Sequence, residues 1–180
     1  GVDGTRFDPA FRSLEWRRSL GIADEAMVVL YVGRIAKEKG LGHALRAMQE
    51  LAITAPQIRF VCVGDGPYEA EMRAGAPASV TFTGRLSGVP LSTAYASSDV
   101  FLFPSVTDTF GNVLLEAMAS GLVIVSADAG NTRELVGTDM SRGVLVDAAA
   151  AGAIATALIA LEGDRARHAA IRANAQRWAH

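Results

Sequence analysis

Uninterrupted runs of apolar residues recur along the chain, with segments rich in helix-forming residues between them. Such runs are typical of strands buried on both faces of a parallel sheet, because these strands have no polar face to show to water. Six segments, most of them such runs, are predicted to be strands: residues 26–32, 58–63, 80–83, 100–103, 122–125 and 143–146.

Helices are expected between and after these strands. Over residues 41–51 apolar side chains recur every three or four positions, as on the buried face of a helix. In the helix predicted over residues 11–20, Arg17 and Arg18 are expected to be exposed. The remaining helices are predicted at residues 68–73, 90–97, 113–119, 132–136, 148–161 and 164–178. This alternation predicts an α/β fold, a doubly wound, Rossmann-like parallel sheet of about six strands with helices on both faces.

Composition fits one domain over residues 1–180. Half of the residues are hydrophobic (50%) and 20% are charged, which allows a substantial core. The formal net charge of −2 gives no electrostatic reason to expect a nucleic-acid partner. Cys62, the single cysteine, lies in a predicted strand and is interpreted as a buried thiol. With no disulfide possible inside the chain, a cytoplasmic location is expected.

Neither a membrane span nor a signal peptide is expected. No apolar run reaches the roughly 20 residues that cross a bilayer. The chain starts at Gly1 and not at Met, so we expect it to be a domain of a longer protein.

The segment 99–121 has the layout of an anion site. An apolar strand leads into a polar loop and then into a helix that ends at Gly121, so backbone N–H groups at the helix start can meet an anion. Asp108 lies in the loop and Glu116 about one turn into the helix. Both can face the carboxyl end of the strand, where open parallel sheets bind ligands.

Other strand ends bring glycines and cations to the same edge. Arg34 and Lys39 flank the loop after the first strand, and their charge suits a phosphate or diphosphate, with N–H groups of glycine turns as further donors. The alternative is that both are solvated loop cations. The loop lacks the P-loop and dinucleotide-binding glycine patterns, so neither an NTPase nor a dinucleotide enzyme is supported.

Glu116 is the carboxylate for which the sequence most strongly suggests a role in ligand binding. It stands among apolar residues, where a carboxylate needs hydrogen-bond donors, and the vicinal hydroxyls of a sugar or ribose would supply them. The alternative is a surface glutamate favoured by the helix dipole. Asp108 could equally be a helix cap. The histidines are scattered without metal-ligand spacing, so no metal site is expected.

Five motifs occur in order, at residues 31–41, 63–67, 82–84, 96–105 and 108–121. Together they resemble the C-terminal, donor-binding domain of retaining GT-B glycosyltransferases (glycosyl transferases group 1, family four), a group that includes bacterial mannosyltransferases and sucrose synthases. The stretch 108–113 is most similar to GDP-mannose-dependent α-mannosyltransferases. The family's acidic pair, two glutamates with seven residues between them, is here Asp108 and Glu116, and Asp108 is one methylene shorter than the family's glutamate.

The resemblance implies a role for each matching residue. Arg34 and Lys39 would hold the donor diphosphate and neutralise the departing nucleoside diphosphate, and Glu116 would bind the ribose hydroxyls. Asp108 would meet the sugar and the distal phosphate, together with the backbone at 110–112. The implied catalytic residues are thus Arg34, Lys39 and Asp108, and the implied donor-binding residues are Gly33, Arg34, Lys39, Gly64, Asp65, Gly66, Phe110, Gly111, Asn112, Val113 and Glu116.

The resemblance also implies substrates and partners. The donor would be a nucleoside-diphosphate sugar, with a GDP-sugar favoured, and transfer of a hexose would need no metal and no other cofactor. The acceptor would be a saccharide or lipid bound by the protein's own N-terminal domain, and a lipid acceptor would place the enzyme peripherally at the inner membrane face. The chain alone is expected not to catalyse transfer.

Two other functions are alternatives for such a chain. One is a non-catalytic nucleotide- or partner-binding α/β module that keeps the fold. The other is an epimerase of the same two-domain architecture, for which the sequence offers no catalytic acid/base set.

Overall fold

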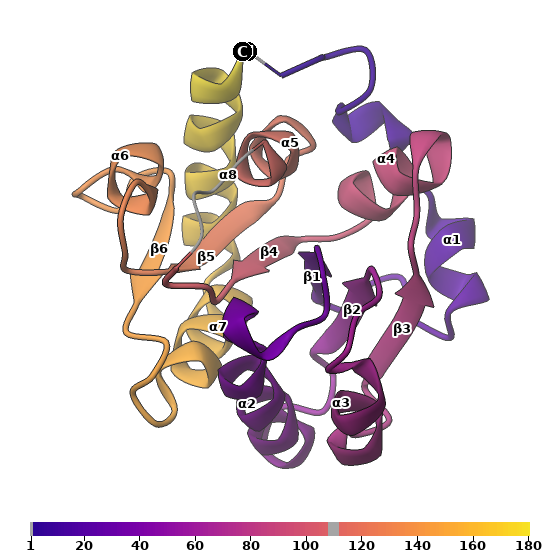
Figure 1. The fold of residues 1–180 in the computed structure, drawn as a ribbon. Coiled ribbons are helices and arrows are strands. Elements are labelled where there is room, and N and C mark those ends of the chain that lie inside the picture. The colour runs from indigo at the N-terminus through magenta and orange to yellow at the C-terminus, as the bar shows by residue number, and fades with distance from the viewer. Residues whose placement is uncertain (1, 108–111) are drawn as a thin grey trace.

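The computed structural model describes residues 2–107 and 112–180. Its strands form one parallel sheet in the order β3-β2-β1-β4-β5-β6 (Figure 1). The strands are β1 (Val28–Val32), β2 (Arg59–Val63), β3 (Val80–Gly84), β4 (Val100–Phe103), β5 (Val123–Ala127) and β6 (Gly143–Val146). The order runs outward in both directions from the β1–β4 pair, which confirms the predicted doubly wound sheet.

Helices cover both faces of the sheet. α2, α3 and α7 pack on one face, while α4, α5 and α6 pack on the other (Figure 1). The helices are α1 (Leu14–Ser19), α2 (Leu41–Thr54), α3 (Glu69–Gly75), α4 (Gly88–Ala96), α5 (Val113–Ala119), α6 (Thr132–Val136), α7 (Ala153–Gly163) and α8 (Arg165–Ala179), with short 3-10 helices at Pro9–Phe11 and Lys37–Lys39. None of the helices in the described ranges is long and apolar enough to cross a membrane.

Burial on both faces explains the unbroken apolar runs. In β1, Val29 and Tyr31 pack into the core under α2 and α3, while Val28 and Leu30 pack into the core under α4 and α5. Successive residues of a strand point to opposite faces, so both sets must be apolar. Cys62 in β2 is buried as expected, and burial raises the pKa of its thiol to about 12.

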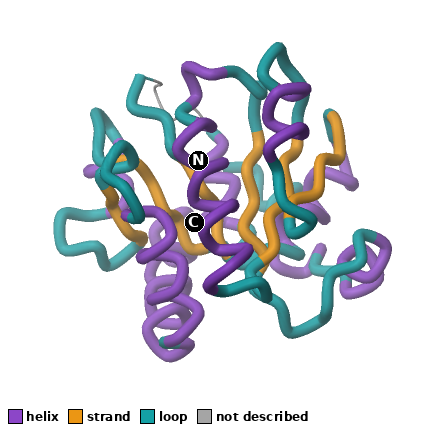
Figure 2. Tube along the Cα trace, turned by 90° about the horizontal axis from the view of Figure 1, so that it is seen from below, coloured by secondary structure: helices purple, strands orange, loops and turns teal. Residues whose placement is uncertain are grey.

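The termini lie close together. Helix α8 packs against α5 and ends beside the N-terminal segment (Figure 2). A methyl group added to Gly4 would lie 3.8 Å from a ring carbon of His180. The last helix therefore closes the fold against its beginning.

Two predicted helices differ from those observed. The helix expected over residues 148–161 begins only at Ala153, because Gly152 takes a left-handed conformation (φ 76°) that interrupts a helix. The helix expected over 11–20 is split. Its regular part starts after Ser13, whose hydroxyl accepts a hydrogen bond from the Trp16 N–H as an N-terminal cap.

The expectation that Arg17 is exposed is wrong, because its side chain has 0% exposure. Its guanidinium donates to carbonyls of Ser97, Asp24 and Ala26 at 2.8–2.9 Å, and to Oδ2 of Asp99 at 2.7 Å. The same Oδ2 accepts the N–H of Val28 at 2.9 Å. This buried network joins α1 to the start of β1 and to the residue before β4. Buried charge is tolerated here because each nitrogen of the guanidinium has at least one acceptor.

Arg17→Met is expected to destabilise the fold, since it leaves the Asp99 carboxylate without its buried partner. The free energy of unfolding should fall by about 3 kcal/mol, measured by urea denaturation. Arg18→Met is the control, because Arg18 pairs with Asp24 on the surface with 64% of its side chain exposed. Equal urea midpoints for the two variants would contradict a structural role for the Arg17 network.

His168 in α8 adds a pH-sensitive contact to this network. Its Nε2 lies 3.3 Å from the carbonyl oxygen of Asp99. Burial lowers the pKa of His168 below its ordinary value of 6.5, and the nearby Asp99 only partly opposes that shift. The folded state therefore disfavours the imidazolium form, whereas the unfolded chain takes up the proton at its usual pKa.

The free energy of unfolding should therefore fall as the pH drops below about 6.5 and through the lower pKa of the folded state. His168→Gln should lose this component, so the stability of wild type relative to the variant should be constant above pH 7 and decline below pH 6. Denaturation curves at a series of pH values measure it. A difference independent of pH would show that His168 does not titrate in this way.

Candidate functional site

The loops that follow β1, β2 and β3 line an open cavity of about 800 Å³ at the carboxyl edge of the sheet. Five of the predicted site residues line it: Gly33, Arg34, Gly64, Asp65 and Gly66. Glu69, Arg85 and Leu86 add to its wall. The carboxyl edge is where open parallel sheets bind ligands, and the loops after β1, β2 and β3 meet there.

The glycines of this cavity allow two loops to touch. A methyl group at Gly64 would lie 1.9 Å from the carbonyl oxygen of Gly33, and one at Gly66 would lie 2.3 Å from that of Ile35. Ile35 N–H in turn donates to the Asp65 carbonyl at 2.8 Å. Side chains at these glycines would push the loops apart and change the shape of the cavity.

The expectation that glycine N–H groups meet an anion needs a correction at two positions. The N–H of Gly33 donates to the carbonyl of Val63 at 3.0 Å, and that of Gly64 donates to the carbonyl of Gly84 at 2.9 Å. Both groups thus already have acceptors within the sheet edge. Gly33 and Gly64 contribute close approach of the backbone and not donors.

Arg34 carries positive charge into this wall. Its side chain is 63% exposed, and Nη1 lies 3.9 Å from Oε1 of Glu38, which is itself 60% exposed. An exposed pair at this distance contributes little, so an anion can draw the guanidinium away from Glu38 at small cost. The backbone is firmer, because the carbonyl of Arg34 accepts the hydroxyl of Tyr31 at 2.7 Å.

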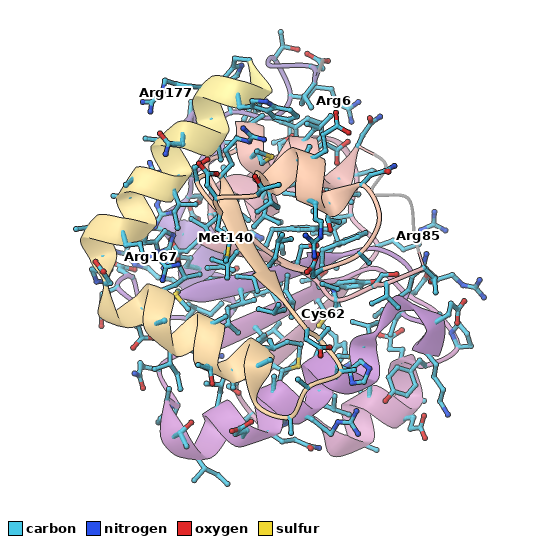
Figure 3. The ribbon with its side chains drawn as sticks, turned by 90° about the vertical axis from the view of Figure 1, so that its left-hand side faces the viewer. Arg6, Cys62, Arg85, Met140, Arg167 and Arg177 are labelled. Carbon is cyan, nitrogen blue, oxygen red and sulfur yellow. The ribbon has the colours of Figure 1, made fainter. Side chains whose placement is uncertain are left out.

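Acidic groups share the cavity. Glu69, in the first turn of α3, uses Oε1 to accept both Nε and Nη2 of Arg73, at 3.1 and 3.0 Å. Asp65 is exposed at the tip of the β2 loop. Arg85 follows β3 and reaches the surface, whereas Cys62 lies inside the molecule (Figure 3). The cavity therefore offers both signs of charge, with cations on the β1 and β3 loops.

The loops after β1 and β4 touch where the strand order reverses. A methyl group at Gly40 (φ 74°) would lie 2.3 Å from the carbonyl oxygen of Pro104, so only glycine fits there. Thr107 Oγ1 donates to the carbonyl of Glu38 at 3.3 Å. Lys39 lies between these two contact points, in the short 3-10 helix Lys37–Lys39, and is half-buried.

Glu116 is half-buried in α5 and is held by a residue that the sequence analysis missed. The hydroxyl of Tyr95, in α4, donates to its Oε2 at 3.1 Å. Tyr95 has 0% exposure, and burial, followed by the charge of Glu116, raises the pKa of its phenol. A buried tyrosine hydroxyl needs a partner, so a tyrosine in a predicted apolar helix was the signal available in the sequence.

The remaining predicted residues are more scattered. Asn112 is exposed just before α5, and Val113 is its half-buried first residue. Asp108, Phe110 and Gly111 lie outside the described residues. Lys39, Asn112, Val113 and Glu116 are not in the wall of the 800 Å³ cavity as far as the described chain goes. The candidate site is thus a cavity over β1–β3 with a separate rim along the β1–β4 boundary.

Within the described ranges, no group of three or more His, Cys, Asp or Glu side chains is placed to hold a metal ion. The Arg34 guanidinium can pair with an anion, and the carboxylate oxygens of Glu116 can accept hydrogen bonds from hydroxyl groups.

Comparison with known sequences places this geometry in a family. A sequence model described as "Glycosyl transferases group 1" matches residues 13–178. Sulfoquinovosyl transferase SQD2 of Arabidopsis thaliana is 44% identical over 143 residues, which cover 77% of this chain and 27% of SQD2. A GDP-mannose-dependent alpha-mannosyltransferase of Mycolicibacterium smegmatis is 39% identical over 149 residues, covering 82% of this chain and 37% of that enzyme. The chain thus spans well under half of these relatives.

Solved structures share the fold. HepE of Anabaena, solved in complex with UDP-glucose, has a TM-score of 0.87 and 28% identity, covering 99% of this chain and 50% of HepE. The C-terminal domain of LpcC from Francisella tularensis has a TM-score of 0.84 at 24% identity, covering 98% of this chain and 95% of that domain, a likeness of fold. From the match over residues 13–178 and the shared sheet, the chain belongs to the glycosyl transferases group 1 family and has the Rossmann-like fold of one half of a GT-B enzyme.

Proposed function

We propose that the chain is the donor-binding part of a retaining glycosyltransferase that transfers a hexose, mannose from GDP-mannose, to a saccharide or lipid acceptor. The observation that carries the proposal is the cavity at the carboxyl ends of β1–β3, with the exposed guanidinium of Arg34 in its wall. A diphosphate suits this cation, and the apolar side chains of the wall suit a nucleobase.

The nucleotide would extend from the cavity toward the boundary between β1 and β4. There the half-buried carboxylate of Glu116 can accept the two ribose hydroxyls, and Lys39, on the β1 loop, can add a second cation. Asp108, with the backbone at 110–112, would meet the sugar. HepE was solved with UDP-glucose, which supports a nucleotide-sugar donor. The choice of GDP and mannose rests on relatives named as GDP-mannose-dependent mannosyltransferases.

The proposed mechanism is electrostatic. Negative charge grows on the departing diphosphate in the transition state, and Arg34 and Lys39 would stabilise it there more than in the ground state. We propose that this needs no metal ion and no resident cofactor. The departing nucleoside diphosphate would stay bound to the same loops until the acceptor is glycosylated.

A second domain of the longer protein would bind the acceptor. The chain covers 50% of HepE and 27–37% of the relatives described above, which leaves room for such a domain. We propose that it is the protein's own N-terminal domain and faces the carboxyl edge of this sheet. The enzyme would act in the cytoplasm, at the inner membrane face if its acceptor is a lipid.

Calorimetric titration of the chain with GDP, UDP and ADP tests the proposal. GDP is expected to bind most tightly, and Arg34→Ala should weaken its binding by about 10- to 100-fold because a charge-assisted hydrogen bond to phosphate is lost. Arg133→Ala is the matched control, since Arg133 is also 63% exposed but lies after β5, where it pairs with Asp128. If both variants bound GDP as the wild type does, the diphosphate would not be at Arg34.

A further inference from the structure

The hydrogen bond between Tyr95 and Glu116 is backed by aromatic packing around the tyrosine ring. Tyr95 is stacked on Phe101, with ring centroids 5.8 Å apart and planes 20° apart. The ring of Phe7 meets it edge-on, at 5.5 Å and 88°. All three rings lie in one buried cluster. Packing of the aromatic rings therefore fixes the position of the phenol independently of its hydrogen bond to the carboxylate.

A glutamate needs such a restraint if it is to act as a rigid acceptor. Its side chain has three rotatable bonds, and the last one is broad, so an exposed glutamate samples many orientations. The hydroxyl of Tyr95 occupies one lone pair of Oε2 at 3.1 Å. Within the described residues no second donor contacts this carboxylate, so its two oxygens keep enough lone pairs to accept two vicinal hydroxyls.

The phenol of Tyr95, which donates this hydrogen bond, also keeps its proton. Burial and the negative charge of Glu116 raise the pKa of Tyr95, so the phenol stays neutral over the ordinary pH range. No water reaches a side chain with 0% exposure, so the hydroxyl would lose its partner if Glu116 turned away. Leaving a buried hydroxyl unsatisfied is unfavourable, and this holds the carboxylate at one orientation.

We propose that Tyr95 is a positioning residue that orients Glu116 for the ribose hydroxyls of the donor, and that Phe7 supports it from the N-terminal segment. The inference rests on the proposed function, because it assigns the ribose to Glu116. On this proposal the segment before α1 helps to support the donor site. Phe7 is far from Glu116 in sequence, but it is buried, with 4% exposure.

The test compares GDP with 2′,3′-dideoxy-GDP, which lacks both hydroxyls. Their affinity ratio isolates the contribution of the ribose hydroxyls, and wild type is expected to prefer GDP by about 10-fold or more. Tyr95→Phe keeps the ring but removes the hydroxyl, so it should weaken GDP several-fold, leave dideoxy-GDP unchanged and bring the ratio toward that of Glu116→Ala. Phe7→Leu should shift the ratio in the same direction by a smaller factor.

Tyr68→Phe is the control, because Tyr68 is a buried tyrosine in the core on the opposite face of the sheet. It should leave the ratio as in wild type. A Tyr95→Phe variant that weakens both nucleotides equally, or neither, would overturn the positioning role. If that variant failed to fold, an unchanged ratio in Phe7→Leu would overturn it instead.

The outcomes separate this inference from the function beneath it. If GDP binding depends on Arg34 but Tyr95→Phe leaves the ratio of GDP to dideoxy-GDP affinity unchanged, only the positioning role is overturned. Absence of binding by any nucleoside diphosphate, or binding indifferent to Arg34, would overturn the donor site and this inference with it.

Discussion

The reversal of strand order between β1 and β4 is the constraint on which the rest of the structure depends. Because crossovers between parallel strands are right-handed, the chain leaving β1 turns to one face as α2, and the chain leaving β4 turns to the other as α5. Their loops part above the sheet, where doubly wound folds bind ligands. Gly40 packed against the carbonyl of Pro104 keeps the bases of these loops together.

The two sides of that boundary carry different chemistry. Arg34, on the β1 loop, can exchange its partner. Its exposed contact with Glu38 is weak, so an anion can replace Glu38 at small cost. Glu116, on the β4 side, is half-buried and accepts a hydrogen bond from the phenol of Tyr95, which the rings of Phe7 and Phe101 hold in place. In the proposed function, the first group would meet the diphosphate and the second the ribose.

The sequence reveals the fold more fully than the site, for physical reasons. Strands buried on both faces leave continuous apolar runs, and glycines at strand ends mark the loops that must touch. The bond between Tyr95 and Glu116 leaves no local pattern, because it joins two helices that only the folded sheet brings together. The prediction that Arg17 is exposed failed for a related reason. Charged residues are usually exposed, and the acceptors of Arg17 are mostly backbone carbonyls, which every residue has and which leave no signal in the sequence. The role expected of Asp108 stays a prediction.

A crystal structure of the chain with bound GDP would show where the nucleotide lies. We expect the diphosphate within hydrogen-bonding distance of Arg34 and both ribose hydroxyls on the carboxylate of Glu116, with the Tyr95 contact intact. Nucleotide found instead in the separate cavity between α2 and α7, lined by His43 and Arg46, would contradict it.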